Sequence, residues 1–156
     1  MGSAQWKVEE HIEAAPDVVY AWMTDFRPDD HDSEAYKRGA GIDPTKKQKP
    51  SRRTILSREG DTVRIRDEWG GSTYEQTLTL DRVARTVRIQ GGMGYEALWR
   101  AAPEGSGTRL SVHGRMGRGI LGSLMKLFEG NMQKSMESDF RGHAEELRES
   151  LKAKAR

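Results

Sequence analysis

The chain has 156 residues, a length that suits one domain with a sizeable core, and it carries 26 Lys and Arg against 24 Asp and Glu. A formal net charge of +2 argues against a sequence-independent nucleic-acid binder, and the absence of cysteine excludes disulfides and thiolate metal sites. The sequence has neither a run of about 18 apolar residues nor a signal-peptide pattern, so we expect a single domain over residues 1–156, located in the cytoplasm without stable membrane insertion.

The first predicted elements are a strand and a short helix. Residues 5–12 alternate, with Trp6, Val8 and Ile12 on one face, which is typical of a half-buried strand. Pro16 suits the first position of a helix, and apolar residues then recur at helical spacing as far as Phe26. Residues 27–50 lose this periodicity and predict a charged loop with one short helix near residues 33–38.

A run of five or six short strands follows, each bounded by turn residues, which implies an antiparallel meander. The apolar positions alternate with charged ones, so one face of the sheet should be buried and the other wetted. Only Leu98 departs from this alternation. The residues expected on the buried face are Val63, Ile65, Trp69, Leu78, Leu80, Val87, Ile89, Tyr95, Ala97, Trp99, Leu110, Val112 and Met116.

The last segment predicts one long helix with an apolar stripe flanked by Lys, Glu and Arg. Glycines interrupt it at positions 122, 130 and 142, where we expect a bend or the close approach of another backbone. The stripe consists of Leu121, Met125, Phe128, Met132, Met136, Phe140, Ala144, Leu147 and Leu151.

This order of elements resembles the START-like superfamily, also described as Bet v 1-like or polyketide cyclase/dehydrase-like. The segment from Ile12 to Tyr20, which contains Ala15-Pro16, and the hairpin from Pro103 to Leu110 carry the resemblance. It implies an α+β helix-grip fold, in which a curved antiparallel sheet of six to seven strands wraps around a long C-terminal helix, with one or two short helices after the first strand. It also implies a cavity between sheet and helix, which different members use for lipids, sterols, plant hormones, polyketide intermediates or protein partners.

Several polar residues share the buried face of the predicted sheet: Asp67, Tyr74, Gln76 and Tyr95, joined by Glu10 from the first strand. A carboxyl group in apolar surroundings has its charged form disfavoured, which suits a general acid. Asp67 is therefore the candidate catalytic residue, with Tyr74 beside it. The alternative is structural, because Asp67 could reach water near a strand end or accept a hydrogen bond from Tyr74 or Gln76.

The same face and the helix stripe supply soft and flat side chains that suit an apolar ligand. Ordinary core packing is the competing interpretation. The candidate ligand-binding residues are Trp69, Gln76, Tyr95, Trp99, Met116, Met125, Phe128, Met132 and Met136.

Neither a cofactor nor a metal is predicted. Residues 117–122 match the dinucleotide-binding glycine pattern, but no parallel strand follows the helix, so the required βαβ unit is missing. The histidines at positions 11, 31, 113 and 143 show no ligand spacing, and the basic residues 46–53 predict a solvated loop.

Three functions remain open. The first is binding or transport of a small hydrophobic molecule in the cavity, oriented by Asp67, Tyr74, Gln76 and Tyr95. The second is a cofactor-independent polyketide cyclase or dehydratase that uses Asp67 or Glu10 as acid and base. The third is a module that binds a protein or a membrane surface, with a protein partner that the sequence does not identify.

Overall fold

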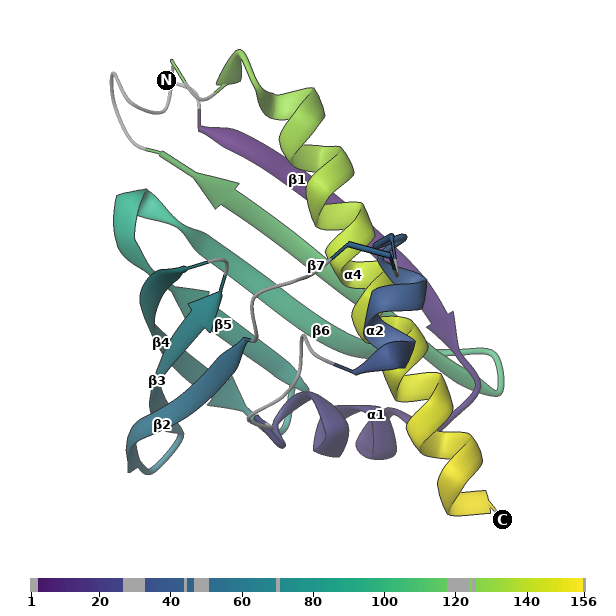
Figure 1. Cartoon of the computed structure of the whole chain (residues 1–156). Helices are drawn as coiled ribbons and strands as arrows, with labels where there is room; N and C mark the ends of the chain where they lie inside the picture. The colour runs from purple at the N-terminus through teal and green to yellow at the C-terminus, as the bar shows by residue number, and fades with distance from the viewer. Residues whose placement is uncertain are drawn as a thin grey trace.

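The computed structural model describes residues 3–26, 33–43, 45–46, 51–69, 71–117, 124 and 126–155. Strands and helices follow in the order expected from the sequence (Figure 1). The elements are β1 (Ala4–Ile12), α1 (Pro16–Met23), α2 (Glu34–Gly39), β2 (Arg52–Glu59), β3 (Thr62–Trp69), β4 (Ser72–Asp81), β5 (Thr86–Gln90), the 3₁₀ turn η1 (Gly92–Gly94), β6 (Glu96–Glu104), β7 (Gly107–Met116) and α4 (Glu129–Ala155).

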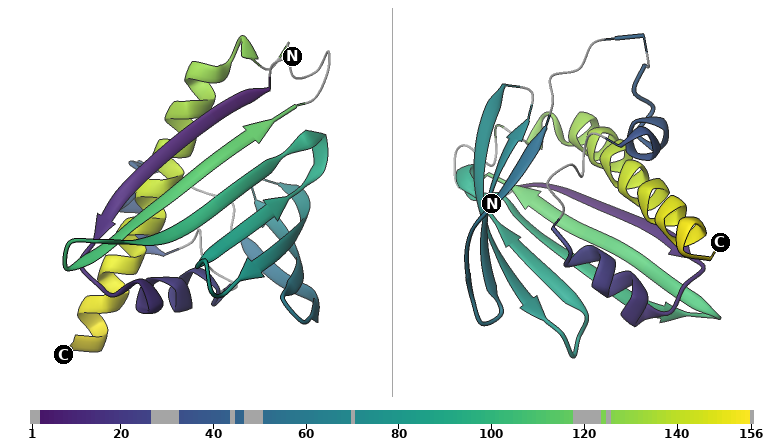
Figure 2. Two further views of the ribbon diagram at one scale, coloured as in Figure 1. Left: turned by 180° about the vertical axis from the view of Figure 1, so that it is seen from behind. Right: turned by 60° about the horizontal axis from the view of Figure 1, so that its bottom comes forward.

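The described strands form one antiparallel sheet of seven strands in the order β1-β7-β6-β5-β4-β3-β2. The first strand pairs with the last, from Ala4 opposite Met116 to Ile12 opposite Thr108. Figure 2 shows how the sheet curves, with α4 crossing its concave side and α1 lying across one end. This is the helix-grip α+β fold that the sequence predicts.

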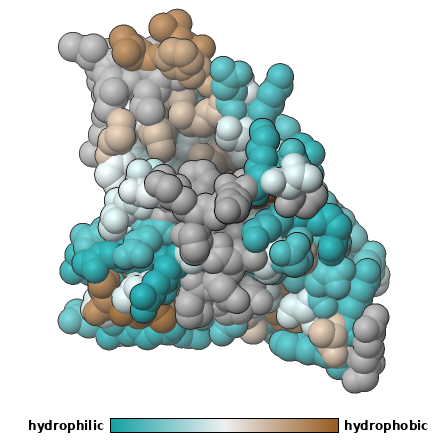
Figure 3. Space-filling view, in the orientation of Figure 1, coloured by the Kyte–Doolittle hydropathy of each residue, from teal (hydrophilic) through white to brown (hydrophobic). Residues whose placement is uncertain are grey.

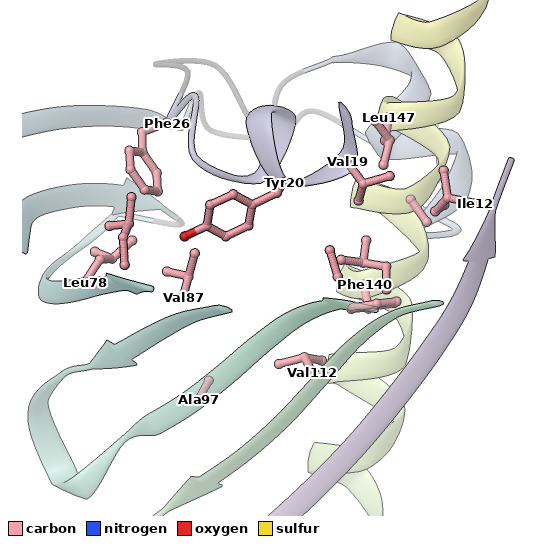
Figure 4. Packing of buried hydrophobic residues seen from close by; sticks show 14 of the residues in the cluster. Ile12, Val19, Tyr20, Phe26, Leu78, Val87, Ala97, Val112, Phe140 and Leu147 are labelled. Atoms are coloured by element: carbon pink, nitrogen blue, oxygen red, sulfur yellow. The ribbon is translucent and has the colours of Figure 1, made fainter. Parts of the chain in front are cut away.

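The concave face of the sheet carries the core. Val63 lies opposite Leu78, and Leu80 lies opposite Val87, so the side chains of neighbouring strands meet on one side as the alternation predicts. Figure 4 shows two of these strand residues, Leu78 and Val87, on the side of the sheet that faces apolar side chains from α1 and α4. Leu98, the exception noted in the sequence, is opposite His113 on the convex face and is half-buried.

Helix α1 begins at Pro16 and packs onto the sheet through Val19 and Tyr20, whose hydroxyl donates to the backbone oxygen of Thr86 (3.0 Å). The apolar spacing that the sequence shows from Pro16 to Phe26 predicts burial only in part. Val18 is 45 % exposed because it lies on the outer side of this short helix, whereas Phe26 is buried beyond the helix end.

Helix α2 packs against α4 rather than against the sheet (Figure 1). A Cβ atom built on Gly142 would lie 2.9 Å from the backbone oxygen of Tyr36 and 2.5 Å from its ring, so the close approach of another backbone predicted at this glycine is confirmed. The hydroxyl of Tyr36 donates to Asp139 Oδ1 (2.5 Å), and that of Ser33 to Glu146 Oε2 (2.5 Å). Polar side chains thus fix α2 onto the middle of α4.

The first half of α4 lies along β1, which is an edge strand of the sheet. Glu129 accepts a hydrogen bond from the backbone N–H of Gln5 (3.1 Å), and Gln133 both accepts from and donates to the backbone of Lys7. Side chains of the helix therefore satisfy backbone groups that a neighbouring strand would otherwise bind. None of the described helices has the length and apolar character needed to cross a membrane.

Candidate functional site

A cavity of about 80 Å³ lies between the concave face of the sheet, helix α1 and the second half of α4. Most of its wall is apolar: aromatic rings come from α1, the residues after it and β6, and aliphatic side chains come from the sheet. Three polar side chains interrupt this wall, one each from β2, β4 and α4. The lining residues are Trp22, Met23, Phe26, Arg53, Ile65, Gln76, Leu78, Val87, Ile89, Trp99 and His143.

The first polar group is the guanidinium of Arg53, which is held by Asp67 on the neighbouring strand. The two residues are directly opposite in the β2–β3 register. Nε of Arg53 donates to Asp67 Oδ1 (2.9 Å), and a terminal nitrogen donates to Oδ2 (3.2 Å), so the pair is bidentate. Their side chains are only 15 % and 16 % exposed. The pair places a fixed donor group in the cavity wall.

The aromatic part of the wall is built from α1, β6 and α4. Trp99 stacks on Phe140 with ring centroids 5.1 Å apart, and its ring meets that of His143 at 75° and 6.0 Å. Trp22 also contacts His143, edge to face, with ring centroids 6.5 Å apart. These contacts give the cavity flat apolar surfaces beside an imidazole.

His143 is buried and has a carboxylate on either side along its own helix. Nε2 is 3.6 Å from Asp139 Oδ1, and Nδ1 is 3.8 Å from Glu146 Oε1. Tyr36 packs on the same imidazole with ring centroids 5.0 Å apart. Burial, followed by the charge of Asp139, raises the pKa of the Tyr36 hydroxyl far above its usual value, so this group stays a hydrogen-bond donor.

This arrangement suits an apolar, flat ligand that carries at least one hydrogen-bond acceptor. Arg53 and Gln76 can donate to an oxygen atom, while the imidazole of His143 can donate or accept a hydrogen bond through its ring nitrogens. No group of three or more metal-ligating side chains occurs among the described residues. The chemistry that these side chains support by themselves is binding, orientation and proton transfer.

The structure brings two of the predicted ligand-binding residues, Gln76 and Trp99, to the cavity. Asp67 lies just behind the wall, bound to Arg53 rather than to Tyr74 or Gln76. Tyr74 lies opposite Asp67 on β4 and is 47 % exposed. Glu10, the other acidic candidate, accepts a hydrogen bond from Arg148 of α4 (3.0 Å).

Other predicted lining residues lie elsewhere along the sheet and α4. Tyr95 stacks on Trp6 (5.7 Å), and burial raises the pKa of its hydroxyl well above 10. Met116 ends β7, Met132 and Met136 are half-buried on α4, and Phe128 is 59 % exposed. The two remaining predictions, Met125 and the side chain of Trp69, lie outside the described residues.

The sequence prediction missed Arg53 and His143. His143 is three residues after Phe140 and four before Leu147, so its place on the apolar stripe was visible in the helical spacing. Arg53 was assigned to a solvated basic loop, because its strand can be aligned only once Asp67 is recognised as its cross-strand partner.

Comparison with known proteins gives a consistent result over nearly the whole chain. The family model described as polyketide cyclase / dehydrase and lipid transport matches residues 3–152. Protein TTHA0849 from Thermus thermophilus is 25 % identical, with a TM-score of 0.63 and coverage of 94 % of this chain and 98 % of that one. No curated protein matches significantly.

Two further solved structures share the fold at lower identity. The Zhui aromatase/cyclase from Streptomyces sp. R1128 is 14 % identical, with a TM-score of 0.64 and coverage of 96 % of both chains. A START superfamily protein from Mycobacterium smegmatis is 18 % identical, with a TM-score of 0.54 and coverage of 94 % of this chain and 99 % of that one.

Proposed function

This chain belongs to the polyketide cyclase / dehydrase and lipid transport family, and from that premise we propose that it binds a small, flat, apolar molecule in the cavity between the sheet, α1 and α4. Arg53, Gln76 and His143 orient an oxygen-bearing group of the ligand. The observation that carries the proposal is an apolar cavity on which three polar side chains from three different elements converge.

The size of the cavity sets a condition on binding. Its volume of about 80 Å³ holds on the order of five water molecules, whereas sites for small molecules usually measure about 300 to 1,000 Å³. Side chains must therefore move to admit a whole ligand. Trp22 and Trp99 are the largest movable groups in the wall, so we expect their fluorescence to report binding.

A fluorescent apolar probe, anilinonaphthalene sulfonate, tests the proposal directly. Ile89→Trp fills the cavity from β5 and should weaken probe binding at least tenfold. Leu98→Trp adds the same side chain on the convex face of the neighbouring strand and should leave binding unchanged. Equal binding by both variants would place the probe elsewhere and count against the cavity.

Native mass spectrometry of the protein purified from its own host identifies the natural ligand class. A bound apolar molecule that is absent from Ile89→Trp supports the proposal. A ligand-free mass, together with no thermal shift across a panel of lipids and polyketides, contradicts it.

A second candidate function is acid–base catalysis, and the burial of His143 in the cavity wall favours it. An imidazole there could take a proton from a carbon between two carbonyl groups, so that the carbanion attacks a third carbonyl and closes a ring. The proton would then return to the new alkoxide oxygen. Arg53 and Gln76 are positioned to stabilise that developing negative charge.

The two functions separate in one comparison, using a poly-β-ketone thioester as substrate. His143→Gln should lower turnover about a hundredfold while probe binding persists if the protein is an enzyme. Asp67→Asn tests the acidic residue proposed from the sequence in the same assay. A carrier would show no turnover above background in any variant.

The cytoplasmic location also remains a prediction, and cell fractionation tests it.

A further inference from the structure

Large apolar side chains are exposed around the start of α4. Leu124, Leu127 and Phe128 come just before the helix and are 58 %, 79 % and 59 % exposed. Met93 in η1 is 60 % exposed. We call these four residues the helix-start surface. They are half of the eight large apolar side chains exposed in the described part of the chain.

Backbone contacts bring the four residues to the same end of the molecule. Gly117, at the end of β7, donates its N–H to the backbone oxygen of Met93 (2.9 Å). The first residues of β1 pair with the last of β7, and Gln5 of β1 bonds to Glu129 at the first position of α4. Figure 3 shows apolar residues gathered at this end, where α4 begins.

The helix-start surface by itself is smaller than one side of a stable protein interface. Four side chains of roughly 200 Å² each, exposed by 58 to 79 %, present on the order of 500 Å². Stable interfaces bury about 800 Å² on each partner. A bilayer imposes no such minimum, because a few apolar side chains can enter its interfacial layer from a protein that otherwise stays in water.

Two exposed lysines lie in or after this surface along the chain. Lys126 lies between its apolar residues, and Lys134 follows on α4; both are exposed, and neither forms an ion pair with another described residue. The nearest acidic residue in the sequence, Glu129, bonds to the backbone of β1. Basic side chains beside an exposed apolar surface favour membranes that contain anionic lipids.

From these observations we infer that the helix-start surface docks on an anionic phospholipid bilayer. Leu124, Leu127 and Phe128 enter the interfacial layer, and Lys126 meets the lipid phosphates. This inference concerns the outside of the molecule, so it does not depend on what the cavity binds.

Co-sedimentation with vesicles of phosphatidylcholine, with and without phosphatidylglycerol, tests the inference. The wild-type protein should bind vesicles that contain phosphatidylglycerol and lose binding at high salt. Leu127→Glu should weaken binding at least tenfold, because burial of one leucine accounts for about that factor. Val83→Glu is the matched control, since Val83 is 93 % exposed in the turn between β4 and β5.

Three results would overturn the inference. The wild-type protein could fail to bind phosphatidylglycerol vesicles, or Leu127→Glu could bind as well as the wild type. Light scattering could also show a wild-type dimer that Leu127→Glu converts to a monomer, which would identify a second copy as the occupant. If Leu127→Glu does not fold by circular dichroism, Leu127→Ser replaces it with the same expected direction.

Discussion

Replacing Gly142 with alanine should destabilise the protein, although alanine is the better helix former. The gain in helix propensity is about 1 kcal/mol. The new Cβ would lie 2.5 Å from Cδ2 of Tyr36 and 2.9 Å from its backbone oxygen, so α2 as a whole must move. Overpacking of this kind costs about 1 to 3 kcal/mol, and the hydrogen bond from Tyr36 to Asp139 contributes about 1.5 to 3 kcal/mol.

With the hydrogen bond lost as well, the net loss is therefore about 1.5 to 5 kcal/mol, which lowers the melting temperature by roughly 3 to 20 °C in a chain of this size. Gly130→Ala is the control in the same helix, because a Cβ there meets nothing within 4 Å. It should stabilise the protein by up to about 1 kcal/mol.

Urea unfolding measures both free energies, and hydrogen exchange measures whether the amides of residues 34–39 lose protection. The essential result is that the free energy of unfolding falls in Gly142→Ala and rises in Gly130→Ala. If Gly142→Ala stabilised the protein as much as Gly130→Ala does, α2 would not be packed on α4 as described. His143 contacts Tyr36, so displacement of α2 should also alter probe binding in the cavity.

Two further predictions concern ion pairs. Asp67→Asn removes the carboxylate from a mostly buried ion pair and should lower the free energy of unfolding in urea by about 3 to 5 kcal/mol. The double variant Arg53→Met with Asp67→Leu replaces both charges by apolar side chains and should recover most of that loss. A loss below about 1 kcal/mol for Asp67→Asn alone would contradict the prediction. His11 bonds to Glu104 (2.7 Å) and Glu13 (2.8 Å), which raise its pKa above 6.5. Its stabilising effect should be complete below pH 6.5 and disappear as the pH rises through the raised pKa; NMR titration showing a pKa at or below 6.5 would refute the assignment.

The sheet was predictable because alternation along a strand follows from geometry alone. Once Val63 and Ile65 were placed inside, the positions of Leu78 and Val87 followed from antiparallel pairing, and the structure confirms them. The pairing of β1 with β7 was not predicted. Nothing in the local pattern of residues 5–12 identifies a partner strand that lies so far along the chain.

The candidate site was less predictable, because it depends on contacts between distant segments. The role of Arg53 requires the β2–β3 register, which shifts between Ile55 and Ser57. That shift cannot be read from apolar spacing. His143 becomes notable only when Tyr36, Asp139 and Trp99 are seen around it.

The stripe on the last helix predicted burial correctly for one half of α4 and not for its start. Phe140, Ala144 and Leu147 are buried against the sheet, whereas Phe128 is largely exposed. The spacing of apolar residues shows which side of a helix is apolar, but it does not show which residues on that side lie over the sheet. Phe128 comes just before α4, and the first half of that helix lies along the edge strand β1, so the same stripe that forms core further along becomes a surface at Phe128.

The small cavity is what the energetics of an unliganded apolar pocket require. Even if it were enclosed and empty, a volume of about 80 Å³ would cost only roughly 2 kcal/mol at about 24 cal/mol for each Å³, which a domain with a stability of about 5 to 15 kcal/mol tolerates. An empty cavity of roughly 300 Å³ would cost about 7 kcal/mol and could consume most of that stability. Under the proposed function, Trp22, Phe26 and Trp99 fill much of this space in the unliganded protein and a ligand would displace them. Ligand binding must then include the cost of moving these rings, so affinity should rise in variants with smaller side chains at these positions even as the unliganded protein becomes less stable.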